Sequence, residues 1–160
     1  MPGHPASCHH TAVRKFNIFA PEFDHSSERP DYSWRGARVG KAIGGEEIGA
    51  CLYELAAGER TYPYHLHHGN EEWVFVVAGT PIVRTPAGER VLRAGDLFCF
   101  PRGPAGAHQV SGPGTVLLLS EKHLPDVVEY PDSGKVGVRG PQAAYNVRRE
   151  PELEYWDGEL

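Results

Sequence analysis

The chain has 160 residues, a length that suits one domain of ordinary size. Its 19 glycines and 14 prolines are many for a helical protein and predict tight turns between short strands. The formal net charge is -5 and the basic residues are scattered, which argues against a nucleic-acid-binding protein.

The N-terminal part has no regular hydrophobic period. Its first ten residues, MPGHPASCHH, lack the basic and then apolar pattern of a signal peptide, and no apolar run reaches the roughly 18 residues of a membrane span. We therefore expect a cytoplasmic protein with a flexible N-terminus at residues 1–15. Residues 16–46 carry aromatic side chains among turn formers, which indicates an irregular arm that packs on the domain or on a partner subunit.

From residue 47 the chain becomes regular. Short runs rich in Val, Ile, Leu, Phe and Tyr end at Gly or Pro, and the connections are too short for the helices of a parallel sheet. We predict an all-β, antiparallel domain at 47–121, followed by a C-terminal extension at 122–160 that begins with an extended piece at 126–130. The predicted strands lie near 47–56, 60–67, 72–78, 81–86, 89–93, 96–100, 107–111 and 115–121.

The segment GERTYPYHLHHGNEEWVFVVAG, residues 58–79, carries the clearest chemical signal. Residues two apart in a strand share a face, so His65 and His67 project to the same side about 6.5 Å apart along the chain. After a turn through Gly69 the next strand returns and brings back a carboxylate. In the register that we expect, Glu72 faces inward with the two imidazoles.

A second segment, GDLFCFPRGPAGAH, ends at His108. His108 lies far along the chain from Glu72, so only a closed or face-to-face sheet brings it to the first segment. Three imidazoles and one carboxylate together suit a divalent first-row metal with open coordination positions. We therefore interpret His65, His67, Glu72 and His108 as metal ligands.

These two segments resemble the two motifs of the cupin superfamily. The first fits as His65-x-His67-x4-Glu72-x6-Gly79, with the glycine before it, Gly58, one residue farther away than usual. The second fits from Gly95 through Pro101-x-Gly103, with a loop two residues longer before His108 and Gly112 in place of the usual asparagine. The flanking stretches resemble small single-domain bacterial cupins related to oxalate decarboxylase or to sugar-phosphate isomerases.

The resemblance implies a double-stranded β-helix, a jelly-roll-like barrel that binds one divalent transition metal, such as Mn, Fe, Zn or Ni, between the two motifs. It also implies a homodimer, for which the segment 16–34 is a candidate contact. The expected function is isomerase, decarboxylase or dioxygenase chemistry on a small polar metabolite. The alternative is a non-catalytic cupin that binds or senses a metabolite.

Two residues are candidates for contact with that metabolite. Arg102 stands in the loop that leads to His108 and is a candidate for binding an anionic substrate. Glu54, in the strand before Gly58, is the only other nearby carboxylate at a plausible inward position. Strand alternation predicts that Tyr62 and Tyr64 point away from His65 and pack outside the barrel.

Overall fold

The computed structural model describes residues 14–149 and 151–159, so nearly all of the predicted flexible segment 1–15 lies outside the described residues. No helix in the described part of the chain is long and apolar enough to cross a membrane. The elements in chain order are β1 (His25–Arg29), β2 (Tyr32–Ala37), α1 (Val39–Ile43), β3 (Ile48–Leu55), β4 (Leu66–His67), β5 (Glu72–Gly79), β6 (Ile82–Thr85), β7 (Gly88–Val91), β8 (Leu97–Phe100), the 3-10 turn η1 (Pro104–Gly106), β9 (Gln109–Ser111), β10 (Gly114–Glu121), β11 (Asp126–Tyr130), the 3-10 turn η2 (Pro131–Ser133), β12 (Lys135–Arg139) and β13 (Ala144–Arg148).

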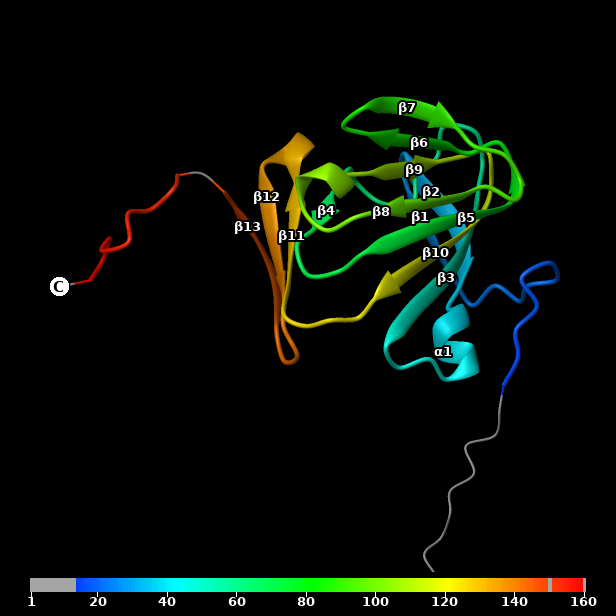
Figure 1. The fold of residues 1–160 in the computed structure, drawn as a ribbon, viewed down its shortest axis with the longest axis horizontal. Helices are drawn as coiled ribbons and strands as arrows, with labels where there is room; N and C mark the ends of the chain where they lie inside the picture. The colour runs from blue at the N-terminus through cyan, green and yellow to red at the C-terminus, as the bar shows by residue number, and fades with distance from the viewer. Residues whose placement is uncertain (1–13, 150, 160) are drawn as a thin grey trace, which may run out of the picture.

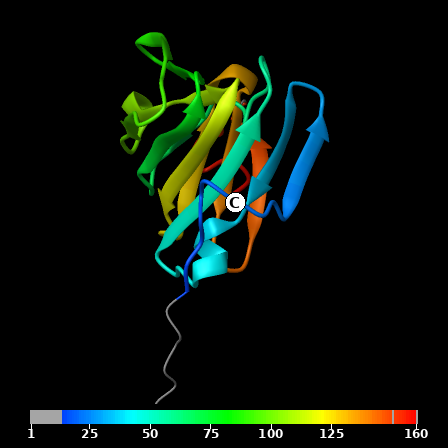
Figure 2. The same ribbon diagram turned by 90° about the vertical axis from the view of Figure 1, so that its right-hand side faces the viewer.

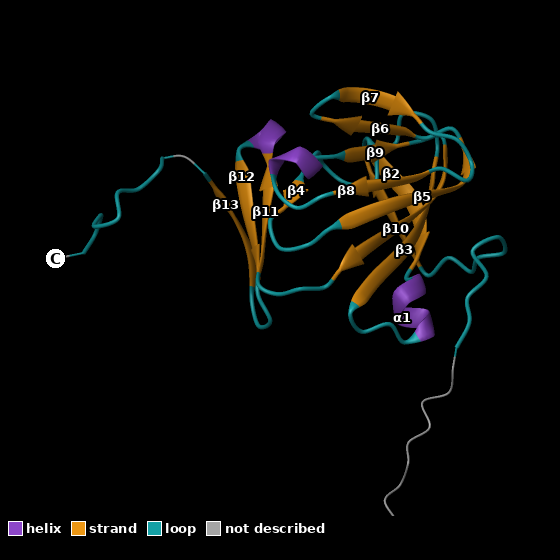
Figure 3. Cartoon of the chain, viewed as in Figure 1, coloured by secondary structure: helices purple, strands orange, loops and turns teal. Residues whose placement is uncertain are grey.

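The strands form three antiparallel sheets, which confirms the predicted all-β class (Figures 1 and 3). The largest has the order β1-β2-β3-β10-β5-β8. The smaller ones have the orders β13-β12-β11-β4 and β7-β6-β9. Figure 1 shows the four-stranded sheet at the left of the molecule and the three-stranded sheet at the top. The main core contains buried side chains from the large and the three-stranded sheets: Tyr53, Leu55, Val74, Val76, Val83, Leu92, Phe100, Val110 and Val116.

The register of β5 sets the face that carries the candidate ligand Glu72. Val74 and Val76 are completely buried in the main core, and they alternate with Phe75 and Val77 on the opposite face. Glu72 shares the inward face because it lies two residues before Val74. The inward register predicted for Glu72 is therefore the one that the structure has.

Part of the predicted irregular arm is regular structure. Residues 25–29 and 32–37 form the hairpin β1–β2, and β2 pairs with β3 at the edge of the large sheet (Figure 2). The sequence HSSER of β1 shows no apolar alternation, because an edge strand is held by main-chain hydrogen bonds and need not bury a face. Trp34 of β2 nevertheless packs against the main core.

The predicted strand at 60–67 is much shorter in the structure. Only Leu66–His67 forms a strand, and the preceding residues bend at 61, 62 and 64 and have single bridges from Arg60 to Ser111 and from His65 to His108. Pro63 interrupts the ladder because it has no N–H to donate. The His65–His108 bridge has two main-chain hydrogen bonds, of 3.0 Å and 2.8 Å, which join the two predicted motif segments directly.

The C-terminal extension contributes more strands than the sequence indicated. The predicted extended piece at 126–130 is β11, and it continues into a hairpin of β12 and β13. β11 also pairs with β4, with Val128 opposite His67. The extension therefore forms one wall beside the two histidines of the first motif.

Gly79 is the glycine whose absence of a side chain matters most. Its φ is +83°, and a Cβ there would lie 2.6 Å from Gly114 Cα and 2.8 Å from Pro113 O. Gly58 has a similar φ of +81°, but a Cβ at that position would meet nothing within 4 Å. Alanine substitutions at Gly58 and Gly79 therefore distinguish the energetic cost of backbone strain alone from the cost of strain together with a steric clash.

We expect Gly79→Ala to lower the free energy of unfolding by about 1–3 kcal/mol more than Gly58→Ala does, because only the former forces two strands apart. Urea unfolding followed by tryptophan fluorescence measures both values. Equal losses in the two variants would show that the close approach of β5 and β10 at Gly79 does not constrain the fold.

Candidate metal centre

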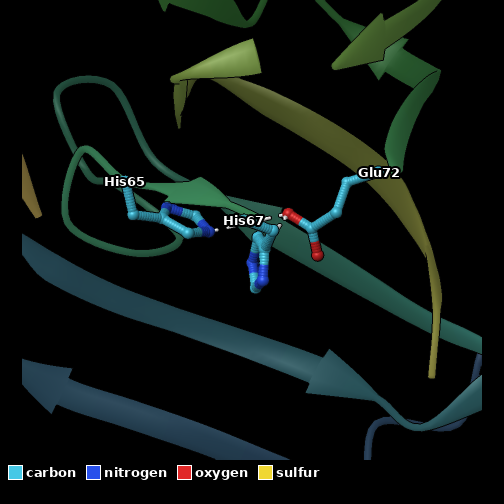
Figure 4. Close-up of side chains that lie close together, drawn as sticks. All are labelled: His65, His67 and Glu72. Carbon is cyan, nitrogen blue, oxygen red and sulfur yellow. Dashed lines mark ion pairs between the residues drawn. The ribbon is translucent and has the colours of Figure 1, made fainter. Parts of the chain in front are cut away.

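Three imidazoles named from the sequence converge on one oxygen of the fourth named side chain, Glu72. Glu72 Oε2 lies 3.5 Å from His65 Nε2, 3.5 Å from His67 Nε2 and 3.1 Å from His108 Nε2. The donor atoms of His65, His67 and Glu72 all lie within 4.8 Å of one another. Figure 4 shows His65 and His67 beside the Glu72 carboxylate, with dashed lines for their ion pairs.

The fold brings these residues together by three separate contacts. His65 and His67 share one face of an extended segment, as their spacing predicts. Glu72 begins the strand that follows the next turn. His108 reaches the group through its main-chain bridge to His65, so the longer loop before His108 does not displace it.

Each imidazole is oriented through its other ring nitrogen. The Nδ1–H of His65 donates to Pro63 O at 2.8 Å, and that of His108 donates to Gly106 O at 2.9 Å. The Nδ1–H of His67 donates to Asp126 Oδ2 at 2.5 Å. Since carbonyl and carboxylate oxygens only accept, Nδ1 carries a proton in all three rings, and each Nε2 faces the centre.

Asp126 is a site residue that the sequence reasoning missed. It is 3% exposed at the start of β11, and its other carboxylate oxygen accepts a hydrogen bond from Gly69 N at 2.8 Å. One side chain thus orients His67 and holds the turn between the two ligand-bearing strands. No motif marks Asp126 in the sequence, because it reaches His67 only through the pairing of β11 with β4.

The charges at the centre depend on one another. Burial by itself would raise the pKa of Glu72, but hydrogen bonds from His108 and His65 and the charge of His67 hold it well below its ordinary value. Burial lowers the pKa of His108, and the hydrogen bond to Glu72 opposes this shift only in part.

This donor set fits a divalent cation. With its proton on Nδ1, a neutral ring presents an Nε2 lone pair, so a cation bound at the centre would meet three nitrogen donors and one carboxylate in place of the Nε2 protons that hydrogen-bond to Glu72 without it. A set of three nitrogens and one oxygen suits first-row transition metals, and the absence of thiolates distinguishes it from most closed structural zinc sites. His65, His67, Glu72 and His108 are the residues that would hold the metal.

A cavity of about 260 Å³ opens beside His65, His67 and Glu72. Tyr62 lines it, which corrects the prediction that Tyr62 packs outside the barrel, and its hydroxyl forms a hydrogen bond with that of Tyr53. The strand alternation behind that prediction fails because Pro63 breaks the strand before His65. The remaining lining residues are Pro63, Val128, Tyr130 and Arg139.

The two predicted substrate contacts, Arg102 and Glu54, are not among the residues that line this cavity. The half-exposed Arg102 pairs with Glu121 at 2.5 Å. Glu54 pairs with Arg35 at 2.7 Å on the surface of the large sheet, while its neighbours Tyr53 and Leu55 point into the core. Neither residue lines the cavity, because the loop and the strand direct their side chains to solvent-exposed partners.

Residues 51–120 match the family described as Cupin domain. Comparison of the sequence with curated proteins gives no match. Among solved structures, a provisionally named sugar phosphate isomerase from Acidithiobacillus ferrooxidans is 26% identical with a TM-score of 0.73, over 83% of this chain and 87% of that chain.

Two further structures share the fold at lower identity. A sugar phosphate isomerase of the cupin superfamily from Silicibacter pomeroyi is 22% identical with a TM-score of 0.75, over 89% of this chain and 98% of that chain. A cupin-like protein from Thermotoga maritima is 18% identical with a TM-score of 0.52, over 68% and 85% of the two chains. These matches confirm the predicted double-stranded β-helix.

The lowered pKa of His108 leads to a prediction about the metal-free protein. We expect its imidazole to titrate below the ordinary value of 6.5. Because the unfolded chain then binds more protons at His108 than the folded chain does, this contribution to the free energy of unfolding is present above about pH 6.5 and is lost as the pH falls toward the folded pKa.

Ring-carbon and ring-proton NMR of the metal-free protein, with the resonance assigned by its loss in His108→Asn, measures the titration. A midpoint at or above 6.5 would contradict the burial that lowers the pKa. The same titration in urea provides the unfolded reference.

Proposed function

Because this chain is a small cupin protein with its cupin domain at residues 51–120, we propose that it binds one divalent transition metal and acts on a small polar metabolite. One observation carries the proposal. Three Nε2 atoms meet one carboxylate oxygen while every Nδ1 is held by an oxygen acceptor. Such second hydrogen bonds are how proteins orient histidines toward a metal.

Mn, Fe, Zn and Ni all suit the donor set, and a bound metal would supply Lewis-acid polarisation of a substrate oxygen or, in the case of iron, activation of dioxygen. The chain itself supplies the position and the surroundings of the substrate. The cavity of about 260 Å³ limits the substrate to a small molecule.

The groups that line the cavity bear on the reaction class. Beyond Glu72, no second carboxylate and no lysine is among the described lining residues, so the protein offers only tyrosine hydroxyls as neutral-pH proton donors. Burial raises the pKa of Tyr62, which therefore stays protonated. This lining favours decarboxylase or dioxygenase chemistry over proton transfer between sugar carbons, which needs a general base.

The name of the Acidithiobacillus protein favours an isomerase instead. Shared architecture alone does not transfer an activity. The residues that line this cavity therefore carry more weight than that name, and isomerase chemistry stays the third candidate after decarboxylase and dioxygenase chemistry. The absence of a general base among the described lining residues also favours the alternative function, a cupin that binds or senses a metabolite without turnover.

The two functions differ in turnover. Forms loaded with iron, manganese, nickel or zinc should convert a keto acid, oxalate, a diketone or a sugar phosphate if the protein is an enzyme. Binding without conversion by all four forms would favour the sensing module.

The ligand set predicts the metal content. We expect protein purified without a histidine tag to hold about one metal equivalent by elemental analysis, and His65→Ala or His67→Ala to hold far less, because each variant removes one of four converging donors. His68→Ala is the matched control, since His68 pairs with Glu129 at the surface. Near-stoichiometric metal in both ligand variants would contradict the site.

We expect a change at Asp126 to cause a smaller loss of metal binding than the ligand variants do. Asp126→Asn keeps the side chain's size but removes the charge that orients His67, and we expect metal affinity to fall about 10- to 100-fold. Glu129→Gln is the matched control, because Glu129 lies on the same strand and pairs with His68, which is not a ligand. Competition with a chromogenic chelator measures both affinities, and an equal effect in the two variants would remove Asp126 from the site.

A further inference from the structure

The cavity beside the metal ligands contains one cationic side chain among its described lining residues, Arg139. Its Nη1 donates to Tyr145 O at 3.1 Å and to Val138 O at 3.3 Å. Its Nη2 donates to Tyr130 Oη at 3.2 Å and to Asn146 Oδ1 at 3.0 Å. All four acceptors are neutral, so these bonds position the guanidinium without cancelling its charge.

The nearby carboxylates are committed to other groups. Asp126 accepts from His67 and Gly69 N. Glu129 pairs with His68 and with Arg149. Within the described residues Arg139 therefore forms no ion pair. By contrast, several other arginines pair with carboxylates on the surface: Arg35, Arg84, Arg102 and Arg149.

Tyr130 connects this cation to the ligand histidines. Its ring stacks on that of His65, with centroids 6.1 Å apart and planes 26° apart, and the ammonium of Lys135 lies 4.7 Å from its ring centroid. Because the Tyr130 oxygen accepts from Arg139, its own proton is available to another acceptor. A hydroxyl that accepts from a cation is a stronger donor for an anion.

We infer that Tyr130 and Arg139 form an oxyanion subsite, which holds the carboxylate or phosphate group of the substrate beside the metal centre. The inference rests on the proposed function, because the metal centre would hold the other end of the same molecule. Both residues belong to β11 and β12, outside the matched cupin domain at 51–120. The C-terminal extension thus selects a small anion, and the barrel supplies the metal ligands.

The test is NMR titration of the zinc-loaded protein with inorganic phosphate and, separately, with acetate. We expect saturable shifts of the resonances of Tyr130 and Arg139 with at least one of the two probes. Saturation by phosphate alone assigns a phosphate ester, and saturation by acetate alone assigns a carboxylate. A response to neither probe overturns the inference.

Variants separate binding from folding. We expect Arg139→Gln to weaken anion binding at least about tenfold, since it removes a charged donor. Tyr130→Phe keeps the ring against His65 and should weaken binding several-fold, which preserves the test if Arg139→Gln fails to fold. Arg102→Gln, the same change at an arginine outside the cavity, should bind as the wild type does. Unchanged affinity in a folded Arg139→Gln or in Tyr130→Phe would overturn the inference.

Elemental analysis of the same samples keeps the two proposals apart. We expect the Arg139 and Tyr130 variants to retain the wild-type zinc content, because neither residue is a metal ligand. A full metal content with no dependence of anion binding on these residues refutes the subsite alone. No zinc in the wild-type protein refutes the proposed function itself.

Discussion

Two main-chain hydrogen bonds between His65 and His108 are the contact on which the site depends. They join the segment that carries the first two histidines to the segment that carries the third, across more than forty residues of chain. Glu72 then reaches all three imidazoles from the neighbouring strand, with its carboxylate oxygen 3.1 to 3.5 Å from their Nε2 atoms. Without this bridge, the second motif segment would not bring His108 beside His65, His67 and Glu72.

The bridge places the rings, and the bonds to Nδ1 orient them. Pro63 O and Gly106 O are each two residues from the histidine they bind, so those two orientations are local properties of the chain. The orientation of His67 is not local, because its acceptor, Asp126, comes from the C-terminal extension. The extension is therefore part of the candidate metal centre as well as a wall beside the barrel.

The same extension changes the character of the cavity. The barrel contributes the candidate metal ligands His65, His67 and Glu72 and, beside them, Tyr62 and Pro63. β11 and β12 contribute Val128, Tyr130 and Arg139. Proteins that share a barrel can therefore differ in substrate through the strands that close its mouth. This is the physical reason that resemblance of fold transfers the ligand set more readily than the reaction.

The sequence by itself determined the all-β class, the turn glycines and the shared face of His65, His67 and Glu72, because strand alternation and turn conformation are set within a few neighbouring residues. The place of His108 beside them depends on its long-range bridge to His65. Tertiary structure decided the rest. The polar strand β1 is recognisable only beside its partner, and Pro63 turned Tyr62 inward against the expected alternation. Arg102 and Glu54 pair with surface partners, Glu121 and Arg35, each 19 positions away in the sequence. Asp126, Tyr130 and Arg139 reach the site because the β11–β12 hairpin pairs with β4 through β11, a long-range contact that no local pattern encodes.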